Sequence, residues 1–133
     1  MDSQHSILVV DDELLIRDLL YDFFNNQGWD ISIAENGERA LEILNTKKID
    51  IVLTDLKMPN MDGLDLTNHV KESHPEMPVV IMTGYPSVDS AVTALRQKVA
   101  DYIIKPFNIN QLYKTIELKI KEAQKQNDSD GKQ

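Results

Sequence analysis

Several side chains able to do chemistry stand directly after short apolar runs in this chain of 133 residues. In chain order they are Asp11, Asp12, Asp55, Thr83 and Lys105. A short apolar run bounded by turn residues is typical of a buried strand. In open parallel α/β sheets, ligands bind at the edge formed by the carboxyl ends of the strands. The sequence therefore predicts one site with three carboxylates, a hydroxyl and an ammonium group.

Such a site is suited to phosphoryl transfer onto a carboxylate. Three carboxylates in one cleft repel one another and raise each other's pKa unless a cation joins them. Mg²⁺ prefers oxygen ligands and keeps room for water and phosphate oxygens. Lys105 offers a compact positive charge for a phosphate oxygen, and Thr83 offers one hydrogen bond. We interpret Asp55 as the nucleophile, with metal and lysine neutralising the transferring group.

The elements that must position these residues alternate regularly along the chain. Five runs read as strands and five segments show helical spacing of apolar residues. Asn36, Ser87 and Asn108 are predicted helix N-caps, and Gly28 is a predicted C-cap. This alternation predicts parallel strands, right-handed crossovers and helices on both faces of the sheet. The expected strands are 7–10, 29–34, 51–55, 78–82 and 101–104; the helices are 13–27, one after Asn36, 63–73, one after Ser87 and one from Asn108 to Ala123.

Composition excludes several classes of protein. The formal charge of −8 argues against nonspecific nucleic-acid binding by this domain, and the absence of cysteine excludes disulfides and thiolate metal sites. Neither a signal peptide nor a membrane span is expected, because no apolar run approaches ~18 residues. We expect a cytoplasmic domain over residues 1–123. The polar residues 124–133 are expected to form a frayed tail or the start of a linker.

With these residues in place, the sequence resembles the receiver domains of two-component response regulators, the family that includes chemotaxis receivers. The matching segments are 9–13, 55–63, 83–84 and 101–107, within a region from Ile7 to Ala123. The resemblance implies a flavodoxin-like, doubly wound α/β fold with five parallel strands in the order 2-1-3-4-5. It also implies a phosphorylation-driven signalling switch rather than an enzyme that turns over a substrate.

The resemblance assigns roles to the individual site residues. Asp55 corresponds to the phosphoacceptor, and Asp11 and Asp12 correspond to the acidic pair that holds Mg²⁺. Lys57 stands where the family provides a backbone carbonyl to the metal.

The remaining roles concern the switch. Thr83 and Lys105 correspond to the residues that contact the phosphoryl group, and Pro106 to a proline that is often cis. Tyr102 corresponds to the aromatic switch residue. The implied phosphodonor partner is a histidine kinase or phosphotransfer protein. The implied output surface is formed by the fourth helix, fifth strand and last helix, which we expect to present Tyr102, Tyr113 and Leu118 to a second copy or an effector domain.

One position departs from the family pattern. Family members usually have Gly-Ala four and three residues before the switch aromatic, where this chain has Lys98-Val99. If the backbone there is left-handed, Lys98 is strained by roughly 1 kcal/mol; otherwise the helix must end differently.

Two other function classes remain open from the sequence. A phosphohydrolase with an aspartyl-phosphate intermediate would need an acid just after the nucleophile, but Leu56 and Lys57 follow Asp55. An interaction module that is never phosphorylated is disfavoured because every site position is filled. The segment 83–86 together with 101–102 weakly resembles receivers of enhancer-binding transcription activators.

Overall fold

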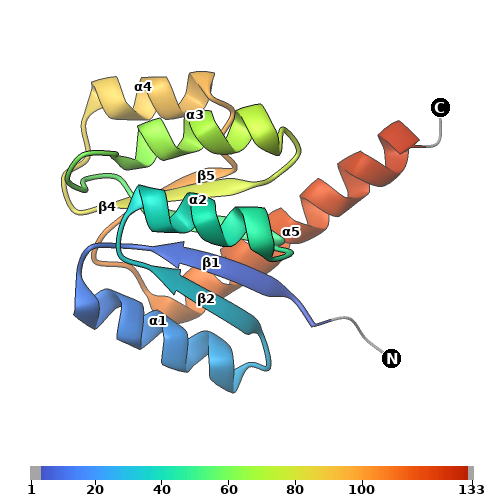
Figure 1. Cartoon of the computed structure of the whole chain (residues 1–133), viewed down its shortest axis with the longest axis horizontal. Coiled ribbons are helices and arrows are strands. Elements are labelled where there is room, and N and C mark those ends of the chain that lie inside the picture. The colour runs from blue at the N-terminus through green and yellow to red at the C-terminus, as the bar shows by residue number, and fades with distance from the viewer. Residues whose placement is uncertain (1–3, 132–133) are drawn as a thin grey trace.

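The structure is a computed structural model that describes residues 4–131, and it has one parallel sheet between two layers of helices (Figure 1). The strand order is β2-β1-β3-β4-β5, as expected, with every neighbouring pair parallel. The strands are β1 (Ser6–Val10), β2 (Asp30–Ala34), β3 (Ile51–Asp55), β4 (Val79–Thr83) and β5 (Asp101–Ile104). The helices are α1 (Leu14–Asn26), α2 (Gly37–Thr46), α3 (Gly63–Ser73), α4 (Val88–Arg96) and α5 (Ile109–Gly131).

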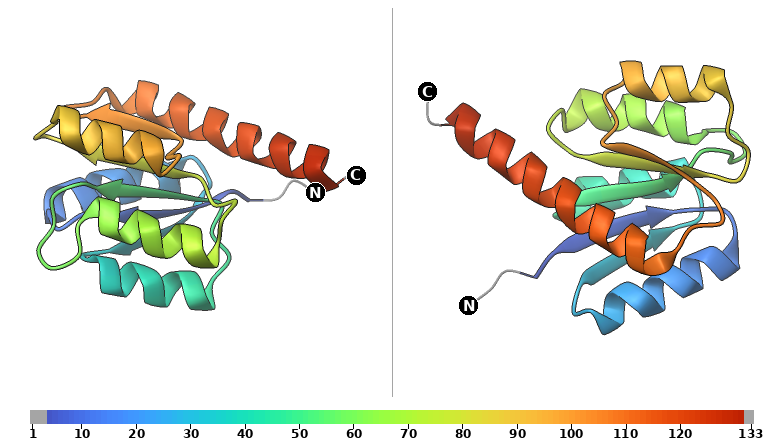
Figure 2. Two further views of the ribbon diagram at one scale, coloured as in Figure 1. Left: turned by 90° about the horizontal axis from the view of Figure 1, so that it is seen from above. Right: turned by 180° about the vertical axis from the view of Figure 1, so that it is seen from behind.

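Two apolar clusters hold the layers together. On one face of the sheet, Leu20 and Phe24 of α1 and Ile116 of α5 pack against alternate residues of the central strands. On the other face, α2 and α3 contribute residues such as Ile43 and Leu66. Figure 2 shows α1 and α5 on the first face and α2 and α3 on the second, with α4 beside α3. The central strands are buried on both faces, which explains why they read as continuous apolar runs.

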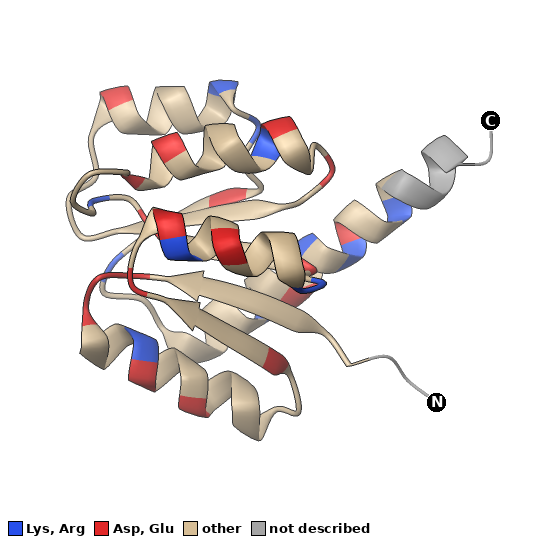
Figure 3. Cartoon of the chain, in the orientation of Figure 1, with Lys and Arg blue, Asp and Glu red and all other residues tan. Residues whose placement is uncertain are grey.

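The register of the sheet places the chemical residues at one edge. Val10 pairs with Thr54, so Asp11 and Asp55 follow directly on neighbouring strands. Asp55 in turn pairs with Met82, and Thr83 pairs with Ile104, the residue before Lys105. Figure 3 shows acidic colouring from the end of β1 into the start of α1. The central strands carry no charged residue before these ends.

The predicted helix N-caps are confirmed. The side chains of Asn36, Ser87 and Asn108 each accept a hydrogen bond from the backbone N–H three residues later. The backbone of α5 continues to Gly131, past Ala123, where a tail or linker is expected to begin. Gln124, Lys125 and Gln126 are good helix formers, and no glycine or proline interrupts them. Residues 132–133 lie outside the described part, and the domain boundary at residue 123 stays a prediction.

Among the described helices, none combines the length and the apolar character required to cross a membrane.

Helices α1 and α4 end in the same motif but with different residues in the left-handed position. After α1, Gly28 has φ +84°, and the N–H groups of Gly28 and Trp29 bond to Asn25 and Phe24 carbonyls. After α4, Lys98 has φ +61°, and Lys98 and Val99 donate to Leu95 and Ala94 in the same way. Both are Schellman motifs. Of the two alternatives for Lys98, the structure therefore adopts the strained left-handed backbone.

We predict that Lys98→Gly stabilises the fold by about 0.5–1 kcal/mol, because glycine has no Cβ penalty in this conformation. Urea unfolding measures the change. Lys98→Ala is the matched control, since it removes the charge but keeps the Cβ and should give no gain. Equal stabilisation by both variants would show that the effect comes from the lysine side chain and not from the backbone.

Candidate functional site

Three aspartates from two strand ends form the centre of the site. One carboxylate oxygen from each of Asp11, Asp12 and Asp55 lies within 4.8 Å of the other two. Asp11 is fully buried and Asp55 is 6% exposed, whereas Asp12 is exposed. Asp12 and Asp55 line a cavity of about 450 Å³ together with Glu13, Lys57, Gly84, Tyr85 and Lys105. The edge predicted from the sequence is therefore one open site.

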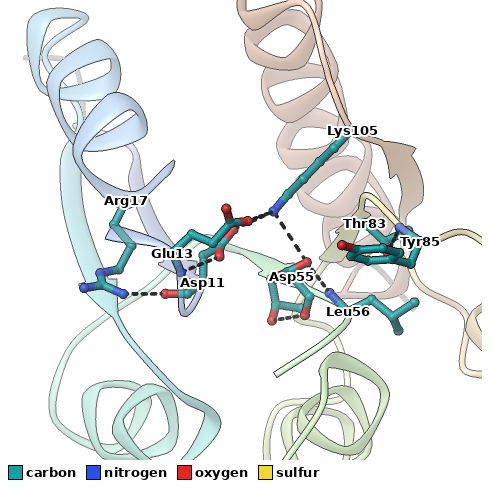
Figure 4. Close-up of polar contacts among 9 residues, drawn as sticks. Asp11, Glu13, Arg17, Asp55, Leu56, Thr83, Tyr85 and Lys105 are labelled. Carbon is teal, nitrogen blue, oxygen red and sulfur yellow. Dashed lines mark hydrogen bonds and ion pairs between the residues drawn. The ribbon is translucent and has the colours of Figure 1, made fainter. Parts of the chain in front are cut away.

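Lys105 reaches into this acidic group from the end of β5 (Figure 4). Its Nζ lies 2.9 Å from Asp11 Oδ2, 3.3 Å from Glu13 Oε1 and 3.6 Å from Asp55 Oδ1. Burial lowers the pKa of Lys105, but hydrogen bonding to Asp11 and the charges of Asp11 and Asp55 outweigh it and raise that pKa above its usual range. Lys105 is therefore a permanent cation between the two buried carboxylates.

The Asp55 carboxyl is the most perturbed acid of the site. Burial, followed by the charge of Asp11, raises its pKa from an ordinary 3.8 to about 6. The charge of Lys105 and a 2.9 Å hydrogen bond from the Leu56 N–H to Asp55 Oδ1 oppose this rise without cancelling it. A carboxylate held in this way is poorly solvated and gains from any cation that joins it.

Backbone and side-chain contacts fix the orientation of Asp11. Its Oδ1 accepts a hydrogen bond from the Glu13 N–H at 2.9 Å, and its Oδ2 accepts one from Lys105. Arg17 donates to the Asp11 carbonyl oxygen at 2.8 Å. Because both carboxylate oxygens have donors, this buried acid has a defined position opposite Asp55.

The oxygen-rich donor set fits a hard divalent cation. Carboxylates of Asp11, Asp12 and Asp55 converge, and no nitrogen or sulfur ligand joins them among the described residues. Oxygen ligands on an open cavity suit Mg²⁺, which keeps several waters. Receiver domains generally bind Mg²⁺ through an acidic cluster, and this chain has such a cluster.

Close packing of the loop after β3 depends on Gly63. The Gly63 N–H donates to the Leu56 carbonyl at 2.8 Å, which folds the loop back onto the end of β3. A Cβ at this position would overlap the Asp55 carbonyl oxygen. Asp62 caps α3 and forms a capping box with Asp65, so it serves the helix terminus and not the carboxylate group. Lys57, in the same loop, is exposed and lines the cavity.

Thr83 lies at the site but is directed along its own loop. It is fully buried, and its hydroxyl accepts a hydrogen bond from the Tyr85 N–H at 2.9 Å. Tyr102, on the next strand, has its hydroxyl 2.7 Å from that of Ser90 in α4. The two expected switch residues therefore each have a partner on the segment that contains α4.

The prediction that Tyr113 belongs to the output surface is wrong. Tyr113 does not lie on the surface formed by α4, β5 and α5. Its ring packs against Phe23, Phe24 and Trp29, and its hydroxyl accepts a 3.0 Å hydrogen bond from Trp29 Nε1. The reason is helical spacing, because Tyr113 lies four residues after Ile109 and three before Ile116, on the core stripe. Leu118, in contrast, is 51% exposed.

Sequence reasoning missed three contributors to the site. Glu13 was not assigned to the site, yet its carboxylate contacts Lys105. Arg17 and Ser90 were not singled out, although they contact Asp11 and Tyr102. The position of Glu13 directly after the acidic pair was a usable signal. The other two contacts depend on tertiary packing. The Lys105–Pro106 bond is cis, as the resemblance implies.

The raised pKa of Asp55 leads to a prediction about stability. Because this pKa is higher in the folded chain, the ionised carboxylate destabilises the fold fully above about pH 6 and not at all below about pH 4. Without Mg²⁺, Asp55→Asn should raise the free energy of unfolding at pH 7 by about 2–3 kcal/mol. The gain should fade as the pH falls from about 6 to about 4.

Urea unfolding in a chelator measures this effect, with the exposed acid Asp18 replaced by asparagine as control. A loss of stability in Asp55→Asn at pH 7 would contradict the prediction.

Comparison with known proteins agrees with this geometry. The chain is 41% identical to the transcriptional regulatory protein ZraR of Klebsiella oxytoca, over 86% of this chain and 26% of ZraR. It is 40% identical to the DNA-binding transcriptional regulator NtrC of Escherichia coli K12, over 90% of this chain and 26% of NtrC. The chain thus spans about a quarter of the length of these curated relatives.

Solved structures show the same fold. A CheY-like receiver domain protein from Methanospirillum hungatei superposes with a TM-score of 0.90 at 30% identity, covering 93% of this chain and 99% of that one. NtrX from Brucella abortus superposes with a TM-score of 0.91 at 31% identity, covering 98% of this chain and 30% of the NtrX chain. The family model of the response regulator receiver domain matches residues 7–117. The chain therefore belongs to the family of response regulator receiver domains.

Proposed function

We propose that this domain is a phosphoacceptor switch in which Asp55 receives a phosphoryl group. The observation that carries the proposal is the convergence of three carboxylates with the ammonium of Lys105, 3.6 Å from Asp55 Oδ1, on an open cavity. An Asp55 oxygen attacks the phosphorus of a phosphohistidine, the phosphorus–nitrogen bond breaks, and an acyl phosphate forms. The departing imidazole nitrogen takes up a proton from solvent.

Each residue of the site has a defined role in this proposal. Asp11, Asp12 and Asp55 would hold Mg²⁺, together with the backbone carbonyl of Lys57. When bound, Mg²⁺ supplies charge neutralisation between the nucleophile and the phosphoryl oxygens. Lys105 donates to a phosphoryl oxygen and keeps the charges of the site balanced. Thr83 donates a hydrogen bond from its hydroxyl to the same group; at present this hydroxyl accepts a hydrogen bond from the Tyr85 N–H.

The partners follow from this chemistry. A histidine kinase or phosphotransfer protein supplies the phosphoryl group, and the domain acts in regulation and does not turn over a substrate. ZraR is a transcriptional regulatory protein, and NtrC is a DNA-binding transcriptional regulator. We therefore infer that the output is control of transcription through another module, in the cytoplasm, with no direct nucleic-acid contact by this acidic domain. The phosphohydrolase alternative lacks support because Lys57 and Leu56 provide no acid after Asp55.

The output route runs from Thr83 to the surface formed by α4, β5 and α5. Movement of Thr83 toward a phosphoryl group vacates space near Tyr102, whose bond to Ser90 connects β5 with α4. Exposed apolar side chains mark this surface: Val88, Leu95, Ile104 and Leu118 are more than half exposed. Gln111 and Thr115 line a cavity with Ile103 and Ile104, and Leu118 follows on the same helical face. A second copy or an effector domain is the expected partner here.

We predict that acetyl phosphate with Mg²⁺ adds the mass of one phosphoryl group to the chain. Asp55→Asn should abolish the gain because the nucleophile is lost, and a chelator should suppress it. Asp62→Asn is the matched control, since it keeps the helix cap and should behave as wild type. Unchanged phosphorylation of Asp55→Asn would refute the assignment, and sustained hydrolysis of phosphate esters would favour the phosphohydrolase.

We also predict that beryllofluoride, a stand-in for the phosphoryl group, changes amide exchange over residues 84–120 and leaves 36–47 unaffected. The reason is that new bonds to Thr83 and Lys105 act on β4, α4 and β5. Asp55→Asn with beryllofluoride serves as the control. Changes confined to α2 would show that the signal leaves by another route.

A further inference from the structure

We propose that Glu13 is a positioning residue that holds Lys105 away from the phosphoryl group and thereby slows phosphorylation of Asp55. This inference rests on the proposed function, because it concerns the rate of that same reaction. It assigns a regulatory role to a side chain that lies beside the acidic group and outside its three carboxylates.

The first observation is that Glu13 does not cap its own helix. It occupies the N-cap position of α1 with extended backbone, where the short side chains of Ser, Thr, Asp or Asn accept a backbone N–H of the first turn. Its side chain accepts no such bond. The carboxylate instead crosses the cavity to Lys105 Nζ at 3.3 Å, a contact between residues 92 positions apart (Figure 4).

The second observation is the distribution of the three donors on Lys105. An ammonium group has three N–H bonds, and here two are directed at Asp11 and Glu13 within 3.3 Å. Asp55 Oδ1 lies slightly farther away, at 3.6 Å. The third N–H is free, but Nζ is held in place by Asp11 and Glu13, and a phosphoryl group on Asp55 lies beyond Oδ1. Nζ must therefore move toward that group, and one of its two present contacts must lengthen.

Burial decides which partner gives way. The Asp11 side chain is fully buried and held by the Glu13 N–H as well, so it has no solvent to turn to. The Glu13 side chain is 63% exposed. Rotation of Glu13 into water therefore releases the ammonium at low cost, and Glu13 acts as the competitor of the phosphoryl oxygens for Lys105.

The size of the effect follows from this exposure. An exposed ion pair contributes little free energy, and its loss changes an equilibrium or a rate by about twofold to fivefold. We expect Glu13→Gln to accelerate phosphorylation by acetyl phosphate and to tighten beryllofluoride binding, both by about twofold to fivefold.

Three variants separate this mechanism from a general electrostatic effect. Asp18→Asn, on the same helix and exposed, is the control for net charge and should resemble wild type. Glu13→Asp keeps the negative charge at the cavity but shortens the side chain by one methylene, so that it no longer reaches Lys105. If Glu13 competes with the phosphoryl oxygens for Lys105, Glu13→Asp should accelerate phosphorylation as Glu13→Gln does. Repulsion of the anionic phosphodonor predicts acceleration by Glu13→Gln alone.

A spectroscopic readout tests the contact independently of activity. The ammonium resonance of Lys105, assigned by its loss in Lys105→Arg, should shift in Glu13→Gln and Glu13→Asp but not in Asp18→Asn. Acceleration by both Glu13 variants together with this shift supports the proposal. Acceleration by Glu13→Gln alone, by neither variant, or equally by Asp18→Asn overturns it. If wild type is never phosphorylated, the proposed function fails, and the resonance and beryllofluoride binding still decide the role of Glu13.

Discussion

The burial of carboxylates that repel one another at one edge of the sheet is the constraint on which the rest of this structure depends. Burial and the neighbouring charge of Asp11 raise the pKa of Asp55 to about 6, so the ionised site opposes folding at neutral pH. Lys105 is the resident cation that offsets this repulsion, and it comes from the end of β5, far along the chain. The charge balance of the site therefore depends on the position of an edge strand. A divalent cation or a phosphoryl group changes that balance directly.

The precision of the site comes from backbone constraints more than from the side chains themselves. Parallel pairing of β1, β3 and β4 aligns the strand ends, and the fully buried central strands leave little freedom to slip. Gly63 allows the following loop to contact the Asp55 backbone. The pair of bonds to Asp11 from the Glu13 N–H and Lys105 sets the orientation of the buried acid. If Asp55 is the nucleophile, as proposed, a carboxylate held in this way needs little reorganisation when a phosphodonor arrives.

The same arrangement connects local charge to a distant surface. Helix α4 buries only Ala94, and polar contacts hold it at both ends: Ser90 to Tyr102, and Gln97 to the Leu64 carbonyl and Asn68. An element with so little buried apolar area has a low free energy of local displacement. In the proposed function, contacts of a phosphoryl group with Thr83 and Lys105 would therefore bias the position of α4. The strained backbone at Lys98, where α4 ends, lowers the stability of this segment further.

The sequence by itself determined the order of elements and the identity of the acidic group. Apolar runs that end in Asp11, Asp55, Thr83 and Lys105 indicate both the strands and the edge at which their ends meet, because parallel strands place their carboxyl ends together. The caps at Asn36, Ser87 and Gly28 follow equally from local chemistry, which acts within one helical turn. Local propensity also explains why the polar stretch after Ala123 continues α5, although its low apolar content suggested a frayed tail.

Only the tertiary structure decided which side chains meet across the fold. Glu13 contacts Lys105 and leaves its own helix uncapped, Tyr113 packs against Trp29 and not at the surface, and Tyr102 bonds to Ser90. Each of these contacts joins residues that lie 12 to 92 positions apart in the sequence, and each forms in competition with other partners. No local pattern records the distances and burial that settle such a competition. Residue types and spacing specify which groups reach the same edge, and packing specifies which of them bind one another.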